Sequence, residues 1–331
     1  MGPVLLLPIL FGFLLTLFIL PMWIKKAKQI GLVWEDMNKP NFPKNVAGSG
    51  GLIVTLGFVF GVLLYVAIRT FVLKIDNTTI EIFAILTSIL IAGMIGFVDD
   101  ILGWTHGGLS KKSRIFLLIF ASIPLVVINA GESTMMGINF GLLYPLILIP
   151  VGIVATSATF NFLAGYNGLE ATQGMIVLSA LAIASYFTGS TWLSLVLLIM
   201  IVCLFAFYLF NKSPAEIFPG DALTYSVGAL IAIAAILGNL EKFAVFIFIP
   251  YVLEVILKAR GKLKVPSFAK VNLDGTLEKP RNKYYGLEHV AIDVAKKIWG
   301  KARENHIVLI INIFQLLVIL LAFVIFRGSF F

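Results

Sequence analysis

Charged residues are scarce in this sequence. Only 13% of its 331 residues are Asp, Glu, Lys or Arg, whereas a typical soluble domain has about 25%. Apolar residues make up 60% of the chain, and the mean hydropathy is +1.01. No soluble fold of this length could bury so many apolar side chains. The sequence therefore predicts an integral membrane protein, in which lipid surrounds most of the surface.

Cysteine and histidine are also nearly absent. The one cysteine, Cys203, lies in an apolar run, so the chain cannot form an internal disulfide. The three histidines, His106, His289 and His306, follow no ligand spacing, which argues against a zinc site. The chain has neither a Walker loop nor a Gly-x-Ser-x-Gly motif. The common signatures of nucleotide hydrolysis and serine hydrolysis are therefore missing.

Long apolar runs are what the sequence has in abundance. A helix of about 20 mostly apolar residues crosses the ~30 Å hydrocarbon layer of a membrane, and ten stretches reach about this length. We therefore predict an all-α polytopic membrane protein with about ten transmembrane helices, forming a single domain over residues 1–331. The predicted spans are 3–24, 48–70, 80–98, 114–130, 140–160, 172–189, 191–210, 221–239, 241–258 and 306–326.

The basic residues divide unevenly between the two sides of the membrane. All 25 lysines and arginines except Arg69, Lys74, Lys242 and Arg327 fall in loops that follow odd-numbered spans. Because cytosolic loops are rich in basic residues, we predict that these loops face the cytosol and that both termini face outside. The first span has no basic segment before it and no cleavage site after it, so we predict that it is retained. The positive charge then indicates a membrane protein rather than a nucleic-acid binder.

The predicted ninth loop, residues 259–304, is the largest segment outside the membrane. An Asp-Gly pair at Asp274 stands between two short alternating stretches and predicts a β-hairpin. Apolar residues then repeat at helical spacing from Leu287 to Ile298, with Glu288 and Asp293 among the charged residues of the opposite face. This pattern predicts an amphipathic helix at the membrane surface. An ordinary solvated helix is the alternative.

Three polar clusters lie at the predicted cytosolic ends of spans. Asp99 and Asp100 end the third span, and adjacent carboxylates repel one another unless a cation or a polar partner is near. The second cluster, residues 161–170, is rich in Asn and Gly and has no basic residue, and the third is residues 218–221. Each cluster alone could be a loop start, a turn or a helix cap. Together on one face, they indicate a functional site.

The clusters offer oxygen ligands. Asp221 and Asn161 suit a hard cation such as Mg²⁺, which commonly binds one or two carboxylates together with substrate phosphates. Mn²⁺ is the alternative. Since the sequence lacks zinc ligands and the common hydrolase motifs, these donors predict metal-assisted phosphate chemistry.

The same segments resemble those of the polyprenyl-phosphate N-acetylhexosamine-1-phosphate transferases. The likeness covers nearly the whole chain. Residues 161–170, which read NFLAGYNGLE, are most similar to the eukaryotic and archaeal branch of this family, whose members use UDP-GlcNAc and dolichyl phosphate. Bacterial cell-wall members have a more acidic version of this segment and a histidine cluster in the ninth loop, where this chain has only His289.

The resemblance implies roles for the residues at the reaction centre. Asp99 and Asp100 match the paired aspartates of the family, and Arg114 takes the place of its usual lysine. Asp221 and Asn161 match the ligands of Mg²⁺.

The resemblance also implies which residues contact the nucleotide sugar. They are Gly165, Asn167, Glu170, Phe218, Lys262 and Lys264. Gly165 and Asn167 match uridine contacts, and Phe218 matches an aromatic residue that stacks on uracil. Lys262 and Lys264 resemble an Arg-x-Arg pair that binds the pyrophosphate.

The implied reaction moves N-acetylglucosamine-1-phosphate, or a related sugar phosphate, from a UDP-sugar to a polyprenyl phosphate and releases UMP. It is the first membrane step of lipid-linked oligosaccharide synthesis for N-glycosylation. We expect direct in-line transfer, with a covalent aspartyl-phosphate as the rival route. The active site would face the cytosol in an archaeal-type cell membrane, or in the endoplasmic reticulum membrane of a eukaryote.

Two other functions stay open. One is a cell-envelope transferase that uses undecaprenyl phosphate. The other is an ion-coupled secondary transporter or flippase, because intramembrane carboxylates and broken helices also mark such proteins. The one-sided clusters and the lack of a repeated half argue against a transporter. The expected partners are a UDP-sugar, a polyprenyl phosphate and the bilayer, with no nucleic acid. The sequence leaves the oligomeric state open, a homodimer included.

Overall fold

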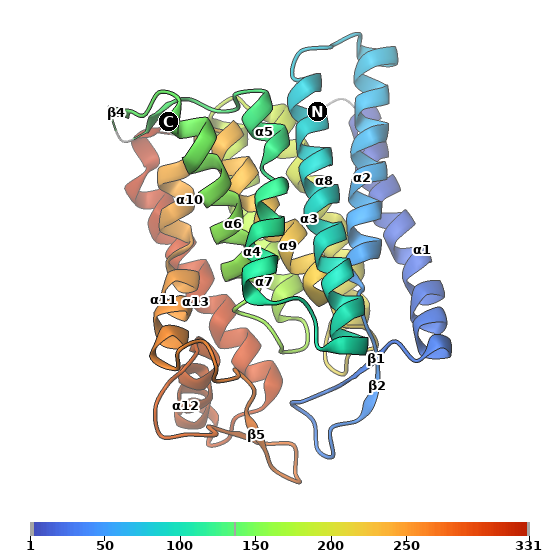
Figure 1. Ribbon diagram of the computed structural model, residues 1–331, viewed down its shortest axis with the longest axis vertical. Helices are drawn as coiled ribbons and strands as arrows, with labels where there is room; N and C mark the ends of the chain where they lie inside the picture. The colour runs from blue at the N-terminus through green and yellow to red at the C-terminus, as the bar shows by residue number, and fades with distance from the viewer. Residues whose placement is uncertain (1–2, 136, 330–331) are drawn as a thin grey trace.

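Helices dominate the computed structural model, which describes residues 3–135 and 137–329. They run side by side along the long axis of the molecule (Figure 1). Within the described residues, seven helices are long and apolar enough to cross a membrane. They are η1–α1 (Pro3–Leu5 and Leu6–Ile30), α2–η2 (Gly51–Ala67 and Ile68–Leu73), α3 (Thr79–His106), α7 (Leu169–Phe187), α8 (Thr191–Asn211), α9 (Gly220–Leu237) and α13 (Glu304–Ile325), which η4 (Arg327–Ser329) follows.

The other three predicted spans are also helical, but two are interrupted and one is a shorter helix. Each has a proline in the first turn of its second piece: Pro124, Pro150 and Pro250. Proline lacks the backbone N–H and clashes with the carbonyl four residues earlier, which breaks a helix. The interrupted segments are α4 (Lys111–Phe120) with α5 (Ile123–Val127), and α10 (Glu241–Ile247) with α11 (Ile249–Arg260). The shorter helix is η3 (Tyr144–Leu148), which runs directly into α6 (Ile149–Phe160). The predicted all-α membrane architecture is confirmed. Seven helices of the described chain are long and apolar enough to cross a membrane, and the number of ten spans stays a prediction.

The central helix is α9, which packs against α2, α3 and α6. Two of the glycines at these contacts show how closely the helices approach. A Cβ at Gly96 of α3 would lie 2.3 Å from the backbone oxygen of Asp221, and one at Gly228 of α9 would lie 2.5 Å from the Cα of Ser157. Real Cβ atoms do not come this close to backbone. The α3–α9 contact therefore requires glycine, and it brings the end of α3 against the start of α9.

Three antiparallel pairs of short strands cover the ends of the bundle. They are β1 (Val33–Glu35) with β2 (Lys44–Ala47), β3 (Thr134–Met135) with β4 (Ile138–Asn139), and β5 (Lys270–Val271) with β6 (Leu277–Glu278). The first and third pairs lie at one end of the molecule, and the second lies at the other (Figure 1). The turn between β5 and β6 contains Asp274, and Gly275 takes a left-handed φ of 76°.

Helix α12 (Leu287–Trp299) packs against α11 and α13. The predicted orientation of this helix is wrong in part. Glu288, which the pattern puts on the polar face, is fully buried together with His289, whereas Ile298 is 61% exposed. The reason lies in the neighbouring helix, because Glu254 of α11 accepts the backbone N–H of Leu287 at 2.6 Å. The bundle is polar at this point, so α12 turns a polar residue towards it.

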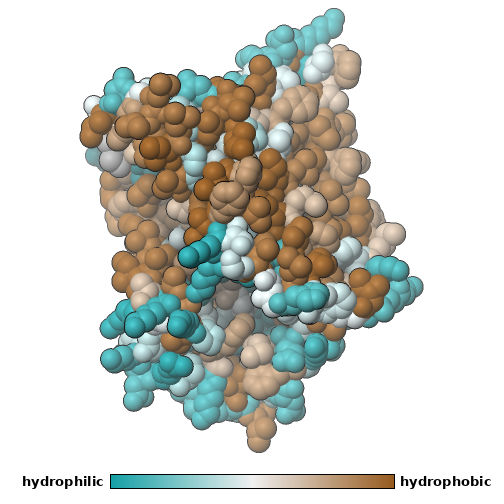
Figure 2. Space-filling view, viewed as in Figure 1, coloured by the Kyte–Doolittle hydropathy of each residue, from teal (hydrophilic) through white to brown (hydrophobic). Residues whose placement is uncertain are grey.

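The surface has an apolar belt between polar ends (Figure 2). Large apolar side chains such as Phe18, Phe71 and Leu320 are well exposed on the outer helices. Helix α1 begins and α13 ends near the end of the molecule opposite α12 (Figure 1). Such a broad exposed apolar surface would make a protein in water aggregate. The chain is therefore an integral membrane protein.

Candidate active site

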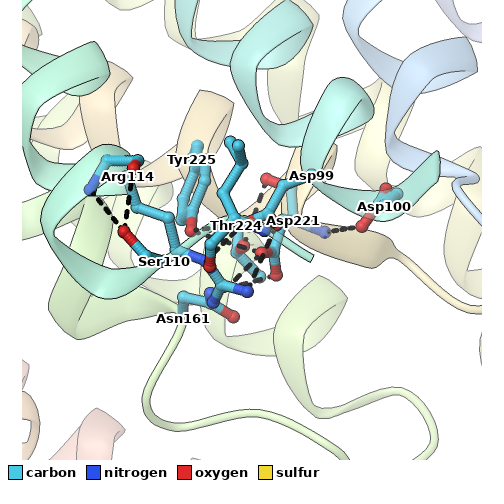
Figure 3. Close-up of polar contacts among 10 residues, drawn as sticks. Asp99, Asp100, Ser110, Arg114, Asn161, Asp221, Thr224 and Tyr225 are labelled. Carbon is cyan, nitrogen blue, oxygen red and sulfur yellow. Dashed lines mark hydrogen bonds and ion pairs between the residues drawn. The ribbon is translucent and has the colours of Figure 1, made fainter. Parts of the chain in front are cut away.

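Four helices deliver polar side chains to the end of the bundle where α12 lies (Figures 1 and 3). Helix α3 carries Asp99 and Asp100, and α4 carries Arg114. Asn161 directly follows α6, and Asp221 is in the first turn of α9. The structure thus brings together all the residues predicted for the reaction centre and the metal. Glycine at position 96, described above, is what lets α3 and α9 meet closely enough for this.

Arg114 links two of the carboxylates. Its Nε lies 2.6 Å from Asp99 Oδ2, and its Nη1 lies 3.7 Å from Asp221 Oδ2. Asp99 Oδ1 also accepts the backbone N–H of Leu109 at 2.7 Å. A buried carboxylate is costly unless it is paired and hydrogen-bonded. Asp99 meets both conditions. Arg114 balances its charge, and its carboxylate is held in place before any substrate binds.

Asp100 faces the start of α9 instead of Arg114. Its Oδ1 accepts the backbone N–H of Asp221 at 2.7 Å, which satisfies one of the free N–H groups of a helix N-terminus. Its Oδ2 is buried and has no hydrogen-bond partner among the described residues. A Cβ at Gly220 would lie 2.1 Å from this carboxylate. Only glycine fits there, and Asp100 is left with one unpaired oxygen.

Asp221 lies between an amide and a phenol. Its Oδ1 accepts from Asn161 Nδ2 at 3.0 Å, and its Oδ2 accepts from the Tyr225 hydroxyl at 3.2 Å (Figure 3). The sequence analysis missed Tyr225. It lies four residues after Asp221 on α9, so the two side chains share one face of the helix. That spacing is the signal that could have found it.

A cavity of about 650 Å³ opens beside Asp221. It is lined by seven of the predicted site residues: Asp100, Asn161, Gly165, Asn167, Glu170, Phe218 and Asp221. The sequence analysis missed other lining residues, among them Asp36 and Phe268. Asp36 lies in the loop between β1 and β2, a polar segment that carries no motif. The aromatic side chains in the lining suit a flat ring, and the carboxylates suit phosphates when a divalent cation lies between them.

The segment 161–170 is closed by its own last residue. The backbone N–H of Gly165 donates to Glu170 Oε1 at 2.8 Å. Gly165 has a φ of 103°, and a Cβ there would lie 3.0 Å from the ring of Phe268. A residue with a side chain would be strained in this backbone conformation. Glu170 therefore holds the loop in shape, although it also lines the cavity.

The two lysines predicted to bind pyrophosphate lie outside the cavity. Lys262 and Lys264 are exposed in the turn after α11, and their side chains make no hydrogen bond or ion pair with described residues. Lys111 Nζ donates to the backbone oxygen of Leu263 between them at 2.9 Å. The turn thus lies beside the start of α4, one helical turn from Arg114. Contact of either lysine with a substrate stays a prediction.

The donor set fits a hard divalent cation. Asp99, Asp100 and Asp221 outnumber the one arginine between them, and Asp100 has a buried oxygen without a partner. No group of three or more His, Cys, Asp or Glu in the described chain is arranged to hold a metal. Mg²⁺ needs no such cage, because phosphate and water oxygens commonly complete its shell. Asp221 and Asn161 could supply its two protein ligands.

The fold and the site define an integral membrane enzyme with an acidic centre at one end of its helices. Comparisons with known proteins identify the family. A family model described as glycosyl transferase family 4 matches residues 82–239. The chain is 38% identical over 319 residues to a Saccharolobus solfataricus protein that bears the provisional name UDP-N-acetylglucosamine–dolichyl-phosphate N-acetylglucosaminephosphotransferase, with 92% of each chain covered.

Two further relatives show how far the similarity extends. A Dictyostelium discoideum protein has the same name, which is not provisional in this case. It is 29% identical over 282 residues, covering 72% of this chain and 68% of its own. A phospho-N-acetylmuramoyl-pentapeptide-transferase of Streptococcus equi subsp. zooepidemicus is 30% identical over 264 residues, covering 74% and 76%. The chain belongs to glycosyl transferase family 4 and, within it, to the archaeal and eukaryotic branch.

Proposed function

We propose that the protein transfers N-acetylglucosamine-1-phosphate from UDP-N-acetylglucosamine to dolichyl phosphate and releases UMP. The names of the archaeal and Dictyostelium relatives supply the two substrates. The observation that carries the proposal is the meeting of Asp99, Asp100, Arg114, Asn161 and Asp221 beside one cavity in a membrane protein. The dolichyl tail would stay in the bilayer while its phosphate reaches this centre.

The proposed topology has ten crossings, with the active site on the cytosolic face. Seven long helices, one shorter apolar helix and two interrupted ones support this number. The basic residues support the orientation, since most of them belong to loops at the end where the site lies. Both termini would then face outside. The likeness to archaeal proteins favours an archaeal-type cell membrane.

The reaction brings two anions together. An oxygen of the lipid phosphate attacks the β-phosphorus of the UDP-sugar, and the bond from that phosphorus to the bridging oxygen breaks, so that UMP leaves with the electron pair. A phosphate monoester has a second pKa of about 6, so the nucleophile is largely ionised at neutral pH. The chain must therefore reduce repulsion between anions more than it must remove a proton.

Arg114 is the cation that the chain itself supplies at the centre. Asp99 holds the guanidinium in place through the 2.6 Å contact, so the side chain is positioned before the substrates arrive. Asp100 has an unpaired oxygen and would accept a residual proton or a hydrogen bond from the lipid phosphate. The two neighbouring aspartates thus have different tasks.

Asp221 and Asn161 would hold Mg²⁺ or Mn²⁺. When bound, such an ion neutralises phosphate charge and stabilises the leaving UMP as a Lewis acid. In the structure the Asn161 amide donates to Asp221. To hold a cation together with Asp221, Asn161 would turn its amide so that the oxygen, and not the NH₂ group, faces the carboxylate. Tyr225 donates to the other oxygen of Asp221 and so orients the carboxylate.

The proposal is tested by the release of UMP from purified protein. UDP-N-acetylglucosamine, dolichyl phosphate and Mg²⁺ are supplied, and each is left out in turn. We expect UMP only when all three are present, and loss of activity in Asp221→Ala. UMP release that needs no lipid, or that persists in EDTA, would contradict the proposal. A phosphorylated enzyme formed from labelled UDP-sugar without lipid would instead support the covalent route.

A further inference from the structure

Asn167 is held from two sides by buried acidic residues. Its backbone N–H donates to Glu304 Oε1 at 2.9 Å, and its side-chain Nδ2 donates to Asp36 Oδ2 at 2.9 Å. Glu304 and Asp36 are only 5% and 4% exposed. Lys39 forms an ion pair with Glu304 and lies 3.9 Å from Asp36 Oδ2, so the two carboxylates share a counter-ion. Asn167 also lines the cavity, as Phe218 does.

The carboxylate of Asp36 decides which way the Asn167 amide faces. An ionised carboxylate can only accept hydrogen bonds, so the amide must turn its NH₂ group towards Asp36. The amide oxygen, Oδ1, is thereby directed away from Asp36. It accepts no hydrogen bond from any residue that the structure describes. A side chain that lines the cavity is therefore left with a free acceptor.

We propose that Asp36 is a positioning residue through which the site selects uracil over cytosine. This inference rests on the proposed function, which brings a uridine nucleotide into the cavity. Uracil and cytosine differ at ring atom N3, which carries a hydrogen in uracil and a lone pair in cytosine. The free oxygen of Asn167 accepts a hydrogen bond from the first and is repelled by the second.

Asp36 is itself fixed by the loop to which it belongs. Its Oδ1 accepts the backbone N–H of Asn38 at 3.3 Å, and the side chain of Asn38 donates to the backbone oxygen of Gly165 at 2.8 Å. The loop between β1 and β2 thus contacts segment 165–167 twice, once at the backbone of Gly165 and once at the side chain of Asn167. A base-binding segment that is already held in this way loses little entropy when the nucleotide binds.

The variant Asp36→Asn tests the proposal. It keeps the size of the side chain but introduces a group that can also donate, so the Asn167 amide is free to face either way. Binding of UMP and CMP to the purified protein is measured by calorimetry. We expect the preference for UMP over CMP to fall about tenfold, the equivalent of one hydrogen bond. An equal loss for both nucleotides would show that Asp36 is merely structural and would overturn the inference.

A second probe needs no variant. In 3-methyl-UMP a methyl group replaces the N3 hydrogen, and we expect the unmodified protein to bind this nucleotide as weakly as CMP. Binding equal to that of UMP would overturn the inference. Asp274→Asn, in the exposed turn between β5 and β6, is the matched control and should leave all three affinities unchanged. If the unmodified protein binds no UMP at all, the proposed function fails, and this inference fails with it.

Discussion

Asp99 and Asp100 are neighbours in the sequence but have different surroundings. Successive residues of a helix point about 100° apart, because 3.6 residues make one turn. Asp99 therefore reaches Arg114 across the gap to α4, whereas Asp100 reaches the backbone of α9. The sequence predicted both carboxylates and the arginine for the site. It could not predict which aspartate pairs with the arginine, because that depends on how α3, α4 and α9 pack.

The free oxygen of Asp100 leads to a prediction about catalysis. Asp100→Asn keeps the size of the side chain but weakens its ability to accept a proton from the lipid phosphate. Because the lipid phosphate is already largely ionised, we expect kcat to fall by about tenfold, the value of one hydrogen bond, while UMP affinity changes little because Asp100 contacts the start of α9 and not segment 161–170. Steady-state kinetics and UMP calorimetry check this. The control is Asp76→Asn in an exposed loop, and an Asp100→Asn enzyme as fast as that control would contradict the assigned role.

Arg114 contacts two carboxylates from one planar group, and this geometry is also testable. A lysine carries the same charge at a single point and cannot copy the fork of a guanidinium. We expect Arg114→Lys to lose about tenfold in kcat/KM and Arg114→Met to lose about a thousandfold. Reaction rates measured over a range of concentrations of each substrate give kcat/KM for the two variants. Equal losses of kcat/KM in Arg114→Lys and Arg114→Met would show that the site needs the geometry of the guanidinium here, and not only its charge.

At the scale of elements, the sequence predicted where helices occur better than where they stop. Apolar composition gave the same signal for the continuous helix α8 as for the broken pair α10–α11. The breaks follow from single prolines, such as Pro250, whose effect an average over 20 residues does not show. The predicted orientation of α12 was wrong for another reason. Its buried face depends on Glu254 and Lys258 of α11, which lie about 30 residues earlier in the chain.

Buried Glu288 makes the packing of α12 sensitive to pH. Its burial, and then the nearby charge of Glu254, raise the pKa of the Glu288 carboxyl well above its ordinary value of 4.5. Both of its oxygens lack hydrogen-bond partners among the described residues. Because the folded state holds the proton more tightly than the unfolded chain, Glu288 increasingly destabilises the fold as the pH rises above about 4.5.

Glu288→Gln removes this titration and tests its sign. We expect the variant to have a higher Tm than the unmodified protein at pH 7, with the difference shrinking as the pH falls towards 4.5. Thermal unfolding in one detergent across this range measures it. Burial and then the charge of Lys258 lower the pKa of the neighbouring His289. The unmodified protein and the variant share His289, so its effect cancels in the comparison. A Tm difference that does not depend on pH would contradict the account.

At the scale of the whole molecule, composition alone predicted the class of protein correctly. The shortage of charge implied a membrane protein, and the structure has an apolar belt with polar ends (Figure 2). The three polar clusters were expected at one end, and they do meet there. What composition could not supply were contacts between distant segments, such as Asp36 with Asn167. Neither residue signals the other in the sequence, because the loop and the segment meet only in the folded chain.

The central claim is that a sugar phosphate, and not a bare sugar, moves to the lipid. The most direct test supplies UDP-N-acetylglucosamine labelled with ³²P at the β-phosphorus, together with dolichyl phosphate and Mg²⁺, and follows the label into the organic phase. We predict that the label appears in the lipid while unlabelled UMP stays in the water. Label that remains in water as UDP while sugar enters the lipid would mean glycosyl transfer, and it would contradict the mechanism derived from this site.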